Sequence, residues 1–420
     1  MKNHQKRIDT HWNWNKMLCR MTKSAFLNTL YTNDNLYVLA GLNSNLVDLI
    51  YLDPPFNSKR IYSATVGRKA AGASFKDMWT WKDVDEQFLG TLAVNYPALA
   101  RYIADAGTIH SKAMMAYLTY MAQRMIEMSR ILKDTGSLYL HCDPTASHYW
   151  KGLLDGIFGK NCFRNEIVWG YQWGGVGKRN FARKHDIIFW YSKSDDKENK
   201  WIFNDQAMRV PYTTKDIRWH NHEEGKLLRD IWEIPTINTQ SKERVGYPTQ
   251  KPLALLRRII NASSNEGDIV LDPFCGCATM CVAAQQLDRK WIGIDIEKQA
   301  AGILVERLSD DAGLFKDFIA TDQIPKRSDI KEVQPTAAIK QRLYKEQQGK
   351  CNGCGVELEL RHLEIDHIVP KAKGGGDYYE NYQLLCGHCN RRKGSKPMEY
   401  LRMQIGTREK MLNQEVFFGE

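Results

Sequence analysis

The feature that most constrains the fold is residues 46–57, where an apolar run ends at an acid and two prolines. Val47 to Leu52 is short and mostly apolar, which predicts a strand buried on both faces of a sheet. Pro54 and Pro55 cannot continue a strand ladder, and each holds its own φ near one value, so the strand must stop at Asp53. Because open α/β sheets bind ligands outside the carboxyl ends of their strands, Asp53 is predicted to face a ligand.

Two later segments repeat this arrangement of a strand that ends at an acid. The apolar residues 269–271 run into Asp272, and a turn of small residues then leads into a helix that starts near Cys281. A second strand, 290–294, ends at Asp295. Small residues in such a turn let the backbone approach a ligand, and an acid at the next strand end can hold ribose hydroxyls. The spacing therefore predicts a site for a nucleoside cofactor.

The residues before Asp53 predict a β-α-β unit. A strand over residues 26–31 is followed by a polar turn that contains Asp34, and then by a short helix that leads to the Asp53 strand. Asp34 has two interpretations, which the sequence does not separate. Its carboxylate could meet the adenine of the cofactor, or it could cap the helix that follows.

Residues 111–143 predict a helix and a further strand. Methionine, leucine and isoleucine recur at helical spacing over 111–133, which indicates a core face. The strand that follows carries His141 and Asp143 at its end, and such groups are more typical of hydrogen-bonded structure than of catalysis. The glycine-rich turn 173–179, which joins two predicted strands, could approach a phosphate backbone closely.

Length and composition indicate a soluble protein of two or three domains, with 420 residues, 43% hydrophobic content and 26% charged content. The net charge of +10 favours polyanionic partners. No signal peptide and no run long enough to span a bilayer are evident in the sequence, so we expect a cytoplasmic protein with no membrane partner. Ten cysteines in such a compartment indicate reduced thiols or metal ligands.

Four of these cysteines form two Cys-x-x-Cys pairs near the carboxyl end: Cys351 with Cys354, and Cys386 with Cys389. This spacing predicts a tetrahedral structural zinc site. The module around it, residues 337–420, is too small for a large core, so the metal is expected to contribute much of its folding free energy. The charged, proline-containing segment 321–336 is interpreted as a linker of moderate stiffness.

Three motifs together resemble the adenine-N6 DNA methyltransferases of the β group, in which the catalytic motif precedes the cofactor motif. They are Asp53-Pro54-Pro55-Phe56, Thr249-Gln250-Lys251-Pro252 and Asp272-Pro273-Phe274-Cys275-Gly276. The resemblance implies an α/β fold with a seven-stranded, mainly parallel, Rossmann-like sheet in circularly permuted order and helices on both faces. It also implies S-adenosylmethionine as methyl donor, double-stranded DNA as substrate and, as in many members, a homodimer.

The family places catalysis on the first motif. The carboxylate of Asp53 and the carbonyl of Pro54 would accept hydrogen bonds from an exocyclic amino group, Pro55 would keep this tip rigid, and Phe56 would stack on a base turned out of the duplex. These hydrogen bonds would direct the amino lone pair, otherwise delocalised into the ring, toward an in-line methyl donor. Enzymes that act on cytosine N4 more often begin this motif with serine, so the acid favours adenine.

The same resemblance implies five cofactor-binding residues: Asp272, Phe274, Gly276, Asp295 and Lys251. Of these, Phe274 and Gly276 would line the methionine side of the cofactor, Asp295 would take its ribose, and Lys251 would neighbour its carboxylate. The chain departs from the family at Ala278, where a second glycine is expected. A methyl group there could clash if the backbone needs a positive φ.

Residues 337–396 resemble the HNH endonucleases. The resemblance rests on Glu364-Ile365-Asp366-His367-Ile368-Val369-Pro370, on Asn381 and on Asn390-Arg391-Arg392-Lys393. It implies His367 as the general base that activates water, Asp366 and Asn390 as ligands of one divalent ion, Mg²⁺, and Asn381 as the residue that fixes the loop of His367. Arg391, Arg392 and Lys393 would contact phosphates. Asn390 replaces the final histidine of the family name, and its amide oxygen can still bind Mg²⁺.

These resemblances divide the chain into a methyltransferase domain over 1–320, a linker over 321–336 and a small zinc-knuckle HNH nuclease domain of the ββα-metal fold over 337–420. Within the first, residues 57–112 and 193–247 are predicted to contact DNA. The predicted function is methylation of adenine N6 in specific DNA sequences, joined to an HNH domain that cuts or nicks DNA in a restriction–modification system. Two alternatives stay open: an HNH tail that only binds DNA, and a nuclease whose methyltransferase fold acts as a sensor.

Overall fold

The computed structural model describes residues 27–405 apart from several short gaps. The gaps are 57–59, 64–73, 78–87, 89–91, 94, 173–178, 197, 199, 213–223, 298, 311–317, 374, 397, 399–400 and 402–403. Much of the predicted DNA-contacting segment 57–112, most of the glycine-rich turn 173–179 and part of 193–247 therefore lie outside the described residues.

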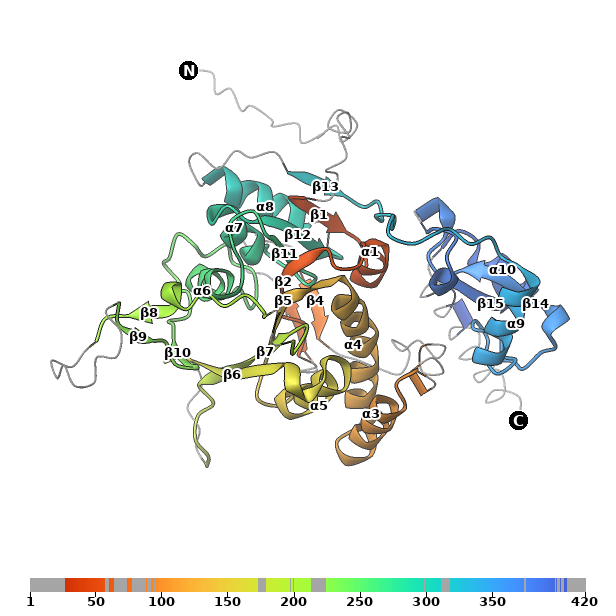
Figure 1. Cartoon of the computed structure of the whole chain (residues 1–420), viewed down its shortest axis with the longest axis horizontal. Helices are drawn as coiled ribbons and strands as arrows, with labels where there is room; N and C mark the ends of the chain where they lie inside the picture. Colours follow the sequence, from red (N-terminus) through yellow and green to blue (C-terminus); the bar gives the residue numbers. More distant parts are fainter. Residues whose placement is uncertain are drawn as a thin grey trace, which may run out of the picture.

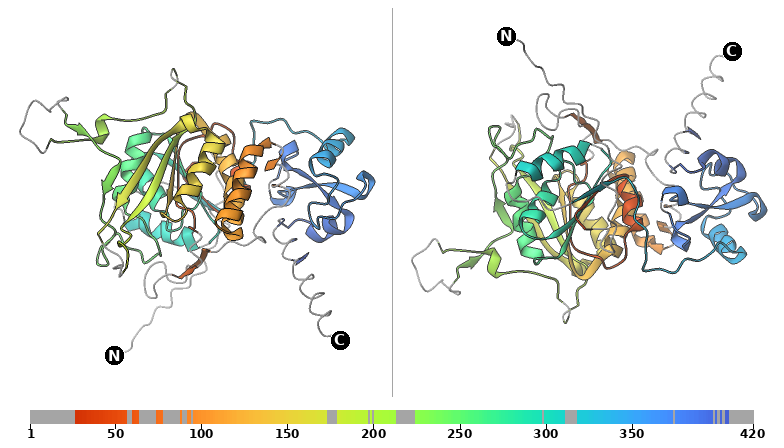
Figure 2. Two further views of the ribbon diagram at one scale, coloured as in Figure 1. Left: turned by 90° about the horizontal axis from the view of Figure 1, so that it is seen from below. Right: turned by 90° about the horizontal axis from the view of Figure 1, so that it is seen from above.

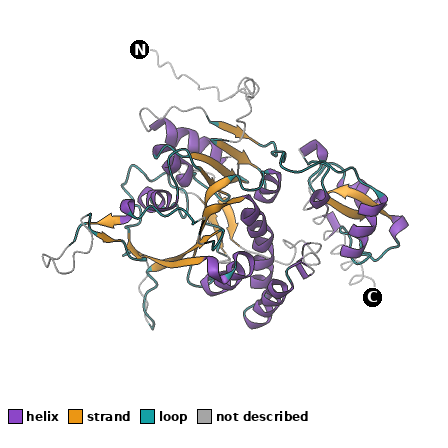
Figure 3. Ribbon diagram, in the orientation of Figure 1, coloured by secondary structure: helices purple, strands orange, loops and turns teal. Residues whose placement is uncertain are grey.

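A nine-stranded sheet forms the centre of the larger body of the molecule (Figures 1 and 3). Every neighbouring pair of strands is parallel except the two pairs that β7 makes with β6 and β5. From one edge to the other the strands are β10 (Ile231–Glu233), β6 (Phe163–Gly170), β7 (His185–Ser192), β5 (Leu132–Cys142), β2 (Val47–Leu52), β11 (Ile269–Asp272), β12 (Lys290–Asp295), β1 (Thr29–Thr32) and β13 (Ile319–Thr321).

The predicted α/β fold with a mainly parallel sheet is confirmed, but the sheet has nine strands where seven were predicted. The two additional strands, β10 and β13, lie at the two edges and contain three residues each. Segments this short show no readable alternation of apolar and polar residues, so the sequence pattern does not reveal them.

The centre of the sheet brings together strands that are far apart in the sequence. β2 lies between β5 and β11, with Leu49 opposite Val270, and β11 in turn pairs with β12. All these pairs are parallel, so their carboxyl ends meet at one edge of the sheet. Asp53, Asp272 and Asp295, each at or just past the end of a strand, therefore lie along the same edge.

Helices cover both faces of the sheet (Figure 2). Alternate residues of β2 point to opposite sides, as the period of a strand requires: Ile50 and Leu52 belong to one apolar core, Leu49 and Tyr51 to the other. The first core is covered by α1 (Asn35–Gly41), α3 (Pro97–Ile109), α4 (Lys112–Ile131) and α5 (Ser147–Phe158), and the second by α6 (Leu253–Ser263), α7 (Thr279–Gln286) and α8 (Gln299–Asp310).

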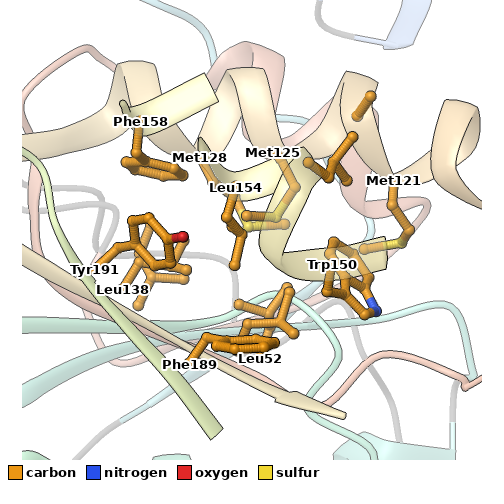
Figure 4. Close-up of a cluster of buried hydrophobic side chains, with 14 of the residues drawn as sticks. Leu52, Met121, Met125, Met128, Leu138, Trp150, Leu154, Phe158, Phe189 and Tyr191 are labelled. Atoms are coloured by element: carbon orange, nitrogen blue, oxygen red, sulfur yellow. The ribbon is translucent and has the colours of Figure 1, made fainter. Parts of the chain in front are cut away.

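The methionines that recur at helical spacing over 111–133 are predicted to form part of the core, and the structure confirms this. Helix α4 begins at Ser111, whose side chain accepts a hydrogen bond from the backbone N–H of Met114, a common helix cap. Met121, Met125 and Met128 are fully buried against the sheet. Figure 4 shows them beside Leu52, Leu138, Trp150, Leu154, Phe158, Phe189 and Tyr191.

Among the described residues of the larger body, two pairs of short antiparallel strands lie outside the main sheet. They are β3 (Arg60–Ser63) with β4 (Ser74–Asp77), and β8 (Arg209–Val210) with β9 (Lys226–Leu227). Among the described residues, no helix is both long enough and apolar enough to cross a membrane.

The carboxyl-terminal module is a smaller body with its own core (Figure 1). It contains α9 (Ala337–Glu346), the antiparallel strands β14 (Leu363–His367) and β15 (Tyr382–Cys386), and α10 (Gly387–Lys393). Strand, strand and helix in this order are the ββα arrangement that the sequence predicts.

The segment between the two bodies is hydrogen-bonded to both of them. On the larger body, the N–H of Ser328 donates to Asn43, and Asp329 accepts from the N–H of Ser44 at 2.9 Å. On the smaller body, the N–H of Val333 donates to the carbonyl of Asp377 at 2.6 Å. A Cβ added at Gly41 would lie 2.0 Å from the carbonyl oxygen of Pro325, so the segment also packs closely against α1.

Candidate functional site

A cavity of about 540 Å³ opens at the carboxyl ends of β1, β2, β11 and β12. Its lining brings together all ten residues that the sequence assigns to methyl transfer and cofactor binding: Asp34, Asp53, Pro54, Pro55, Phe56, Lys251, Asp272, Phe274, Gly276 and Asp295. These residues come from three separate parts of the chain. The shared cavity is the arrangement that a direct transfer between a cofactor and a base held by Asp53 requires.

Asp53 is held by one cation and keeps one oxygen uncommitted. Its Oδ2 accepts a hydrogen bond from the ammonium of Lys251, in an ion pair whose side chains are 18% and 9% exposed. Its Oδ1 is buried and has no hydrogen-bond partner among the described residues. A buried acceptor without a partner is costly, so this oxygen is set to receive a donor from a ligand.

Lys251 contacts both ends of the motif that begins at Asp53. Besides its ion pair, its Nζ lies 5.4 Å from the centroid of the Phe56 ring. The resemblance predicts that Lys251 neighbours the carboxylate of the cofactor, and that role stays a prediction. The partner that the structure gives to this lysine is Asp53, the acid predicted to be catalytic.

The turn that presents Lys251 is built by local hydrogen bonds. The side chain of Gln250 accepts from the N–H of Val245 at 3.0 Å and donates to the carbonyl of Glu243 at 2.8 Å. Thr249 has a φ of 63°, which is uncommon for a β-branched residue. Strained backbone of this kind is found most often where a side chain must be aimed at a functional site.

The turn predicted to bind the cofactor places two acids, and no cation among the described residues is hydrogen-bonded to either. Asp272 accepts from the N–H of Phe274 at 3.1 Å, and Asp295 accepts from the N–H of Gly276 at 2.8 Å and from that of Glu297 at 2.8 Å. Burial raises the pKa of Asp272 well above its ordinary value, and the charges of Asp53 and Asp295 add to the rise. Burial also raises the pKa of Asp295 to about 6. Both carboxylates would gain from hydroxyl donors on a ligand.

Ala278, which replaces a glycine expected from the family, has the positive φ that Sequence analysis identifies as unfavourable for a residue with a side chain. Ala278 has φ 56° and ψ 33°, the left-handed region where an alanine costs about 1–2 kcal/mol more than glycine. Its side chain is fully buried, and it is absent from the lining of the cavity. The strain is therefore stored beside the cofactor turn, and the methyl group does not narrow the site.

Asp34 is the helix cap that one of its two interpretations predicts, and it also lines the cavity. Its Oδ1 accepts from the N–H of Leu36 at 2.8 Å and pairs with Arg124 at 2.9 Å. Arg124 is nearly fully buried and also donates to Asn35, which in turn donates to the carbonyl of Pro273. Sequence analysis missed Arg124, although an arginine among the buried methionines of α4 was the available signal.

His141 lies beneath Phe56 and is fully buried. Its Nδ1 is 3.0 Å from the hydroxyl of Tyr51, its Nε2 is 3.0 Å from Oδ2 of Asp186, and its ring stacks on Phe56 with the centroids 6.1 Å apart. Burial opposes ionisation of Asp186, but the hydrogen bond from His141 and the charge of Lys251 bring its pKa below the ordinary value. These contacts agree with the prediction that His141 is a hydrogen-bonded structural residue.

The four cysteines of the carboxyl-terminal module form one cluster. Their Sγ atoms all lie within 4.8 Å of one another, and those of Cys354 and Cys386 are 4.0 Å apart. A zinc ion with Zn–S bonds of about 2.3 Å needs sulfur atoms roughly 3.8 Å apart, so these residues fit it. The thiol of Cys389 and backbone N–H groups lower the pKa of Cys351 to about 4. The four sulfur donors and the distances between them are those of a zinc-binding site.

His367 stands at the end of β14 and pairs with a residue that sequence analysis missed. Its Nε2 is 2.7 Å from Oδ1 of Asp377, which also accepts from the hydroxyl of Tyr382 at 3.1 Å. The hydrogen bond from Lys371, and then that from His367, lower the pKa of Asp377 below its ordinary range. Asn381 accepts from the N–H of Val369 at 2.8 Å and donates to its carbonyl at 3.1 Å, and so holds the loop after His367.

The residues predicted to hold the divalent ion, Asp366 on β14 and Asn390 on α10, are hydrogen-bonded to different partners. Asp366 accepts from Lys393 at 2.9 Å, and Asn390 donates to Glu364 at 2.6 Å. The amide oxygen of Asn390 is then the atom available to a hard cation. The prediction that Lys393 contacts phosphates is wrong, because Lys393 is 1% exposed and its Nζ also donates to the carbonyl of His367 at 2.8 Å.

Comparison with known families agrees with both sites. A family model for DNA methylases of the N6/N4 type matches residues 47–306, and one for HNH endonucleases matches residues 351–396. The sheet, its acid-ended strands and their common cavity define an α/β fold of the methyltransferase type. The chain belongs to the N6/N4 DNA methylase family and carries an HNH endonuclease domain, so the predicted combination is confirmed.

The relatives include bacterial modification enzymes. The type II methyltransferase M.HpaI of Haemophilus parainfluenzae is 31% identical over 299 residues, which cover 71% of this chain and 78% of that protein. The DNA adenine methyltransferase YhdJ of Escherichia coli (strain K12) is 27% identical over 330 residues, covering 74% and 95%.

Solved structures with detectable likeness are more distant. The complex of M1.HpyAVI with SAM is 21% identical, with a TM-score of 0.37, and the match covers 67% of this chain and 98% of that one. The PvuII DNA methyltransferase, described as cytosine-N4-specific, is 12% identical, with a TM-score of 0.44, and the match covers 68% and 89%.

Proposed function

We propose that this protein transfers a methyl group from S-adenosylmethionine to the N6 amino group of adenine in specific sequences of double-stranded DNA. The observation that carries the proposal is the state of Asp53. One of its oxygens is held by Lys251, and the other is buried without a hydrogen-bond partner among the described residues, inside the cavity that Asp272 and Asp295 also line.

The chain's own residues prepare the amino group. Its two N–H bonds donate to Oδ1 of Asp53 and to the carbonyl of Pro54, and this directs the nitrogen lone pair out of the plane of the ring. Phe56, backed by the buried ring of His141, stacks on the base that has left the duplex. Asp53 then takes the proton that the amino group must lose once it carries a methyl.

The cofactor fits the opposite side of the cavity. Asp295 accepts hydrogen bonds from the ribose hydroxyls, Phe274 and Gly276 line the methionine side, and Asp34 faces the adenine. The bound cofactor supplies an electrophilic methyl group. The buried carboxylates of Asp272 and Asp295, whose pKa values are raised, support this placement, because each is stabilised as an anion by hydroxyl or amino donors.

The choice of adenine over cytosine is supported by the acid at position 53 and by one relative, YhdJ, that is named as a DNA adenine methyltransferase. The competing outcome is methylation of cytosine N4, which belongs to the same broad family.

The test is transfer of tritiated methyl groups to unmodified bacterial DNA, followed by mass spectrometry of the hydrolysed nucleosides. N6-methyladenine is the expected product, and Asp53→Ala abolishes its formation. Asp143→Ala is the matched control, because Asp143 also follows a strand but caps the N–H of Ala146 and is absent from the cavity lining. N4-methylcytosine as the product would refute the base assignment. If the parent transfers nothing, the sensor alternative gains.

We further propose that the HNH domain cuts or nicks DNA with Mg²⁺ held by Asp366 and Asn390. The supporting observation is the pairing of His367 with Asp377, since an aligned carboxylate fixes a histidine in the orientation that a general base needs. His367→Ala is expected to stop Mg²⁺-dependent nicking of supercoiled plasmid, whereas His362→Ala, an exposed histidine of the same module, leaves it unchanged. If the parent does not nick at all, the domain that only binds DNA is the better account.

A homodimer, a cytoplasmic location and the domain limits given above stay predictions.

A further inference from the structure

The connection between β6 and β7 leaves the sheet beside the candidate active site. Cys142 at the end of β5 pairs with Ile187 near the start of β7, and Gly170 at the end of β6 pairs with His185. β5 runs parallel to β2, so this connection emerges at the carboxyl edge where Asp53 stands.

The ends of this connection, Tyr171 and Asp186, are hydrogen-bonded to each other, and Asp186 is also hydrogen-bonded to His141, whose ring stacks on Phe56. The hydroxyl of Tyr171 donates to Oδ1 of Asp186 at 3.2 Å, and Oδ2 of Asp186 is 3.0 Å from Nε2 of His141, on which Phe56 stacks. Phe181 lies five positions before Asp186, so the Cα atoms of the two residues are at most about 17 Å apart.

The described part of the connection is cationic and carries one aromatic side chain in full contact with solvent. Phe181 is 100% exposed, and Arg179 and Arg183 on either side of it are also exposed. Lys184 follows and donates to the carbonyl of Gln172 at 3.1 Å. A single exposed apolar residue is common, but a fully exposed phenylalanine between two arginines at the edge of an active site suits a polyanion with stacked rings.

We infer that residues 179–184, which we call the wedge loop, enter the DNA duplex at the target site. Phe181 inserts between bases at the gap left when the target base turns out. Arg179 and Arg183 contact the flanking phosphates. Phenylalanine wedges of this kind offset lost base stacking, and cations beside them neutralise the backbone. This inference rests on the proposed methylation of a base turned out of double-stranded DNA.

The first test separates paired from unpaired target bases, once sequencing of modified DNA has supplied the recognition site. Phe181→Ala is expected to lower kcat/KM on a fully paired duplex roughly tenfold or more, within the range that one base–aromatic stack contributes. The same variant should come within about threefold of the parent when the target base is mismatched, because an unpaired base leaves the stack more easily. Phe181→Trp should retain activity on both. Ile319→Ala, which removes a side chain that is 47% exposed on the edge strand β13, is the control.

The second test needs no methyl transfer. A photoreactive benzoylphenylalanine is placed at Phe181 or, as the control, at Ile319 on the edge strand β13, and the full chain is irradiated with fragmented bacterial DNA. Crosslinks at the first position that clearly exceed those at the second support the wedge loop as a DNA contact, even if the parent transfers no methyl group to any DNA. Equal crosslinking, or a Phe181→Ala variant as impaired on mismatched as on paired DNA, would overturn the inference.

Discussion

Replacing Lys251 with methionine removes the cation next to Asp53 while keeping most of the aliphatic stem. The ion pair is largely buried, with side chains 9% and 18% exposed, so water cannot substitute fully for the ammonium. A hydrogen bond to a charged group contributes about 1.5–3 kcal/mol to the state that contains it. If that amount is lost from the aligned, ionised form of Asp53, the rate of methyl transfer should fall roughly 10- to 150-fold, since about 1.4 kcal/mol corresponds to a factor of ten.

The assay must report chemistry and cofactor binding separately, because Lys251 has two candidate partners. Single-turnover transfer of tritiated methyl groups measures the first, and isothermal titration with S-adenosylmethionine measures the second. If Lys251 acts through Asp53, the turnover rate falls and the Kd of the cofactor changes by less than about threefold. Lys290→Met is the matched control, because Lys290 is an exposed lysine at the amino end of β12, away from the carboxyl edge of the sheet where the cavity opens.

The opposite pattern would refute this reasoning. A cofactor Kd weakened tenfold or more, together with an unchanged single-turnover rate, would mean that Lys251 serves the carboxylate of the cofactor, as the resemblance predicts, and that its pairing with Asp53 has no part in catalysis.

Three further predictions concern other groups described above. Burial raises the pKa of Asp295 to about 6, so its carboxylate is protonated below that pH; affinity for S-adenosylmethionine measured by titration calorimetry should therefore rise between pH 5 and pH 7, and Asp295→Asn should bind more weakly and lose this dependence. Cys354→Ser should abolish stoichiometric zinc, measured by elemental analysis, and make the carboxyl-terminal module sensitive to protease, while methyl transfer persists; a zinc-free module that resists protease would contradict a structural metal. Asp377→Ala should slow plasmid nicking about 10- to 100-fold, as loss of an orienting hydrogen bond does, whereas nicking at the parental rate would show that His367 needs no such partner.

The features that could be predicted from the sequence are those encoded within a few residues. Asp53, Asp272 and Asp295 each follow an apolar run directly, and parallel strands bring such ends to one edge, so their meeting in one cavity followed from local pattern and general topology. The two cysteine pairs are likewise local, and the structure joins them into one cluster.

The features that were missed depend on contacts between distant segments. Arg124 reaches Asp34 from another helix, and Asp186 reaches His141 from another strand, so neither pairing has a signature in the sequence. Asp377 lies ten residues after His367, outside the motif that contains this histidine. The conformation of its loop is held by a hydrogen bond from Asn381 to the carbonyl of Gly376. Lys393 was placed on phosphates because it continues a basic run, yet helical geometry turns it inward to Asp366.

The connecting segment determines how the HNH domain can be used. Asp329 is hydrogen-bonded to Ser44 of the larger body, and Val333 is hydrogen-bonded to Asp377 of the smaller body. Asp377 in turn is hydrogen-bonded to His367. An HNH domain attached by a flexible linker would cut the duplex at variable positions around the site where the protein is bound. If the HNH domain cuts DNA as proposed, a connecting segment that is hydrogen-bonded at both ends keeps it at a fixed position relative to the methyltransferase domain. Breaks should then fall at one fixed number of base pairs from the recognition site.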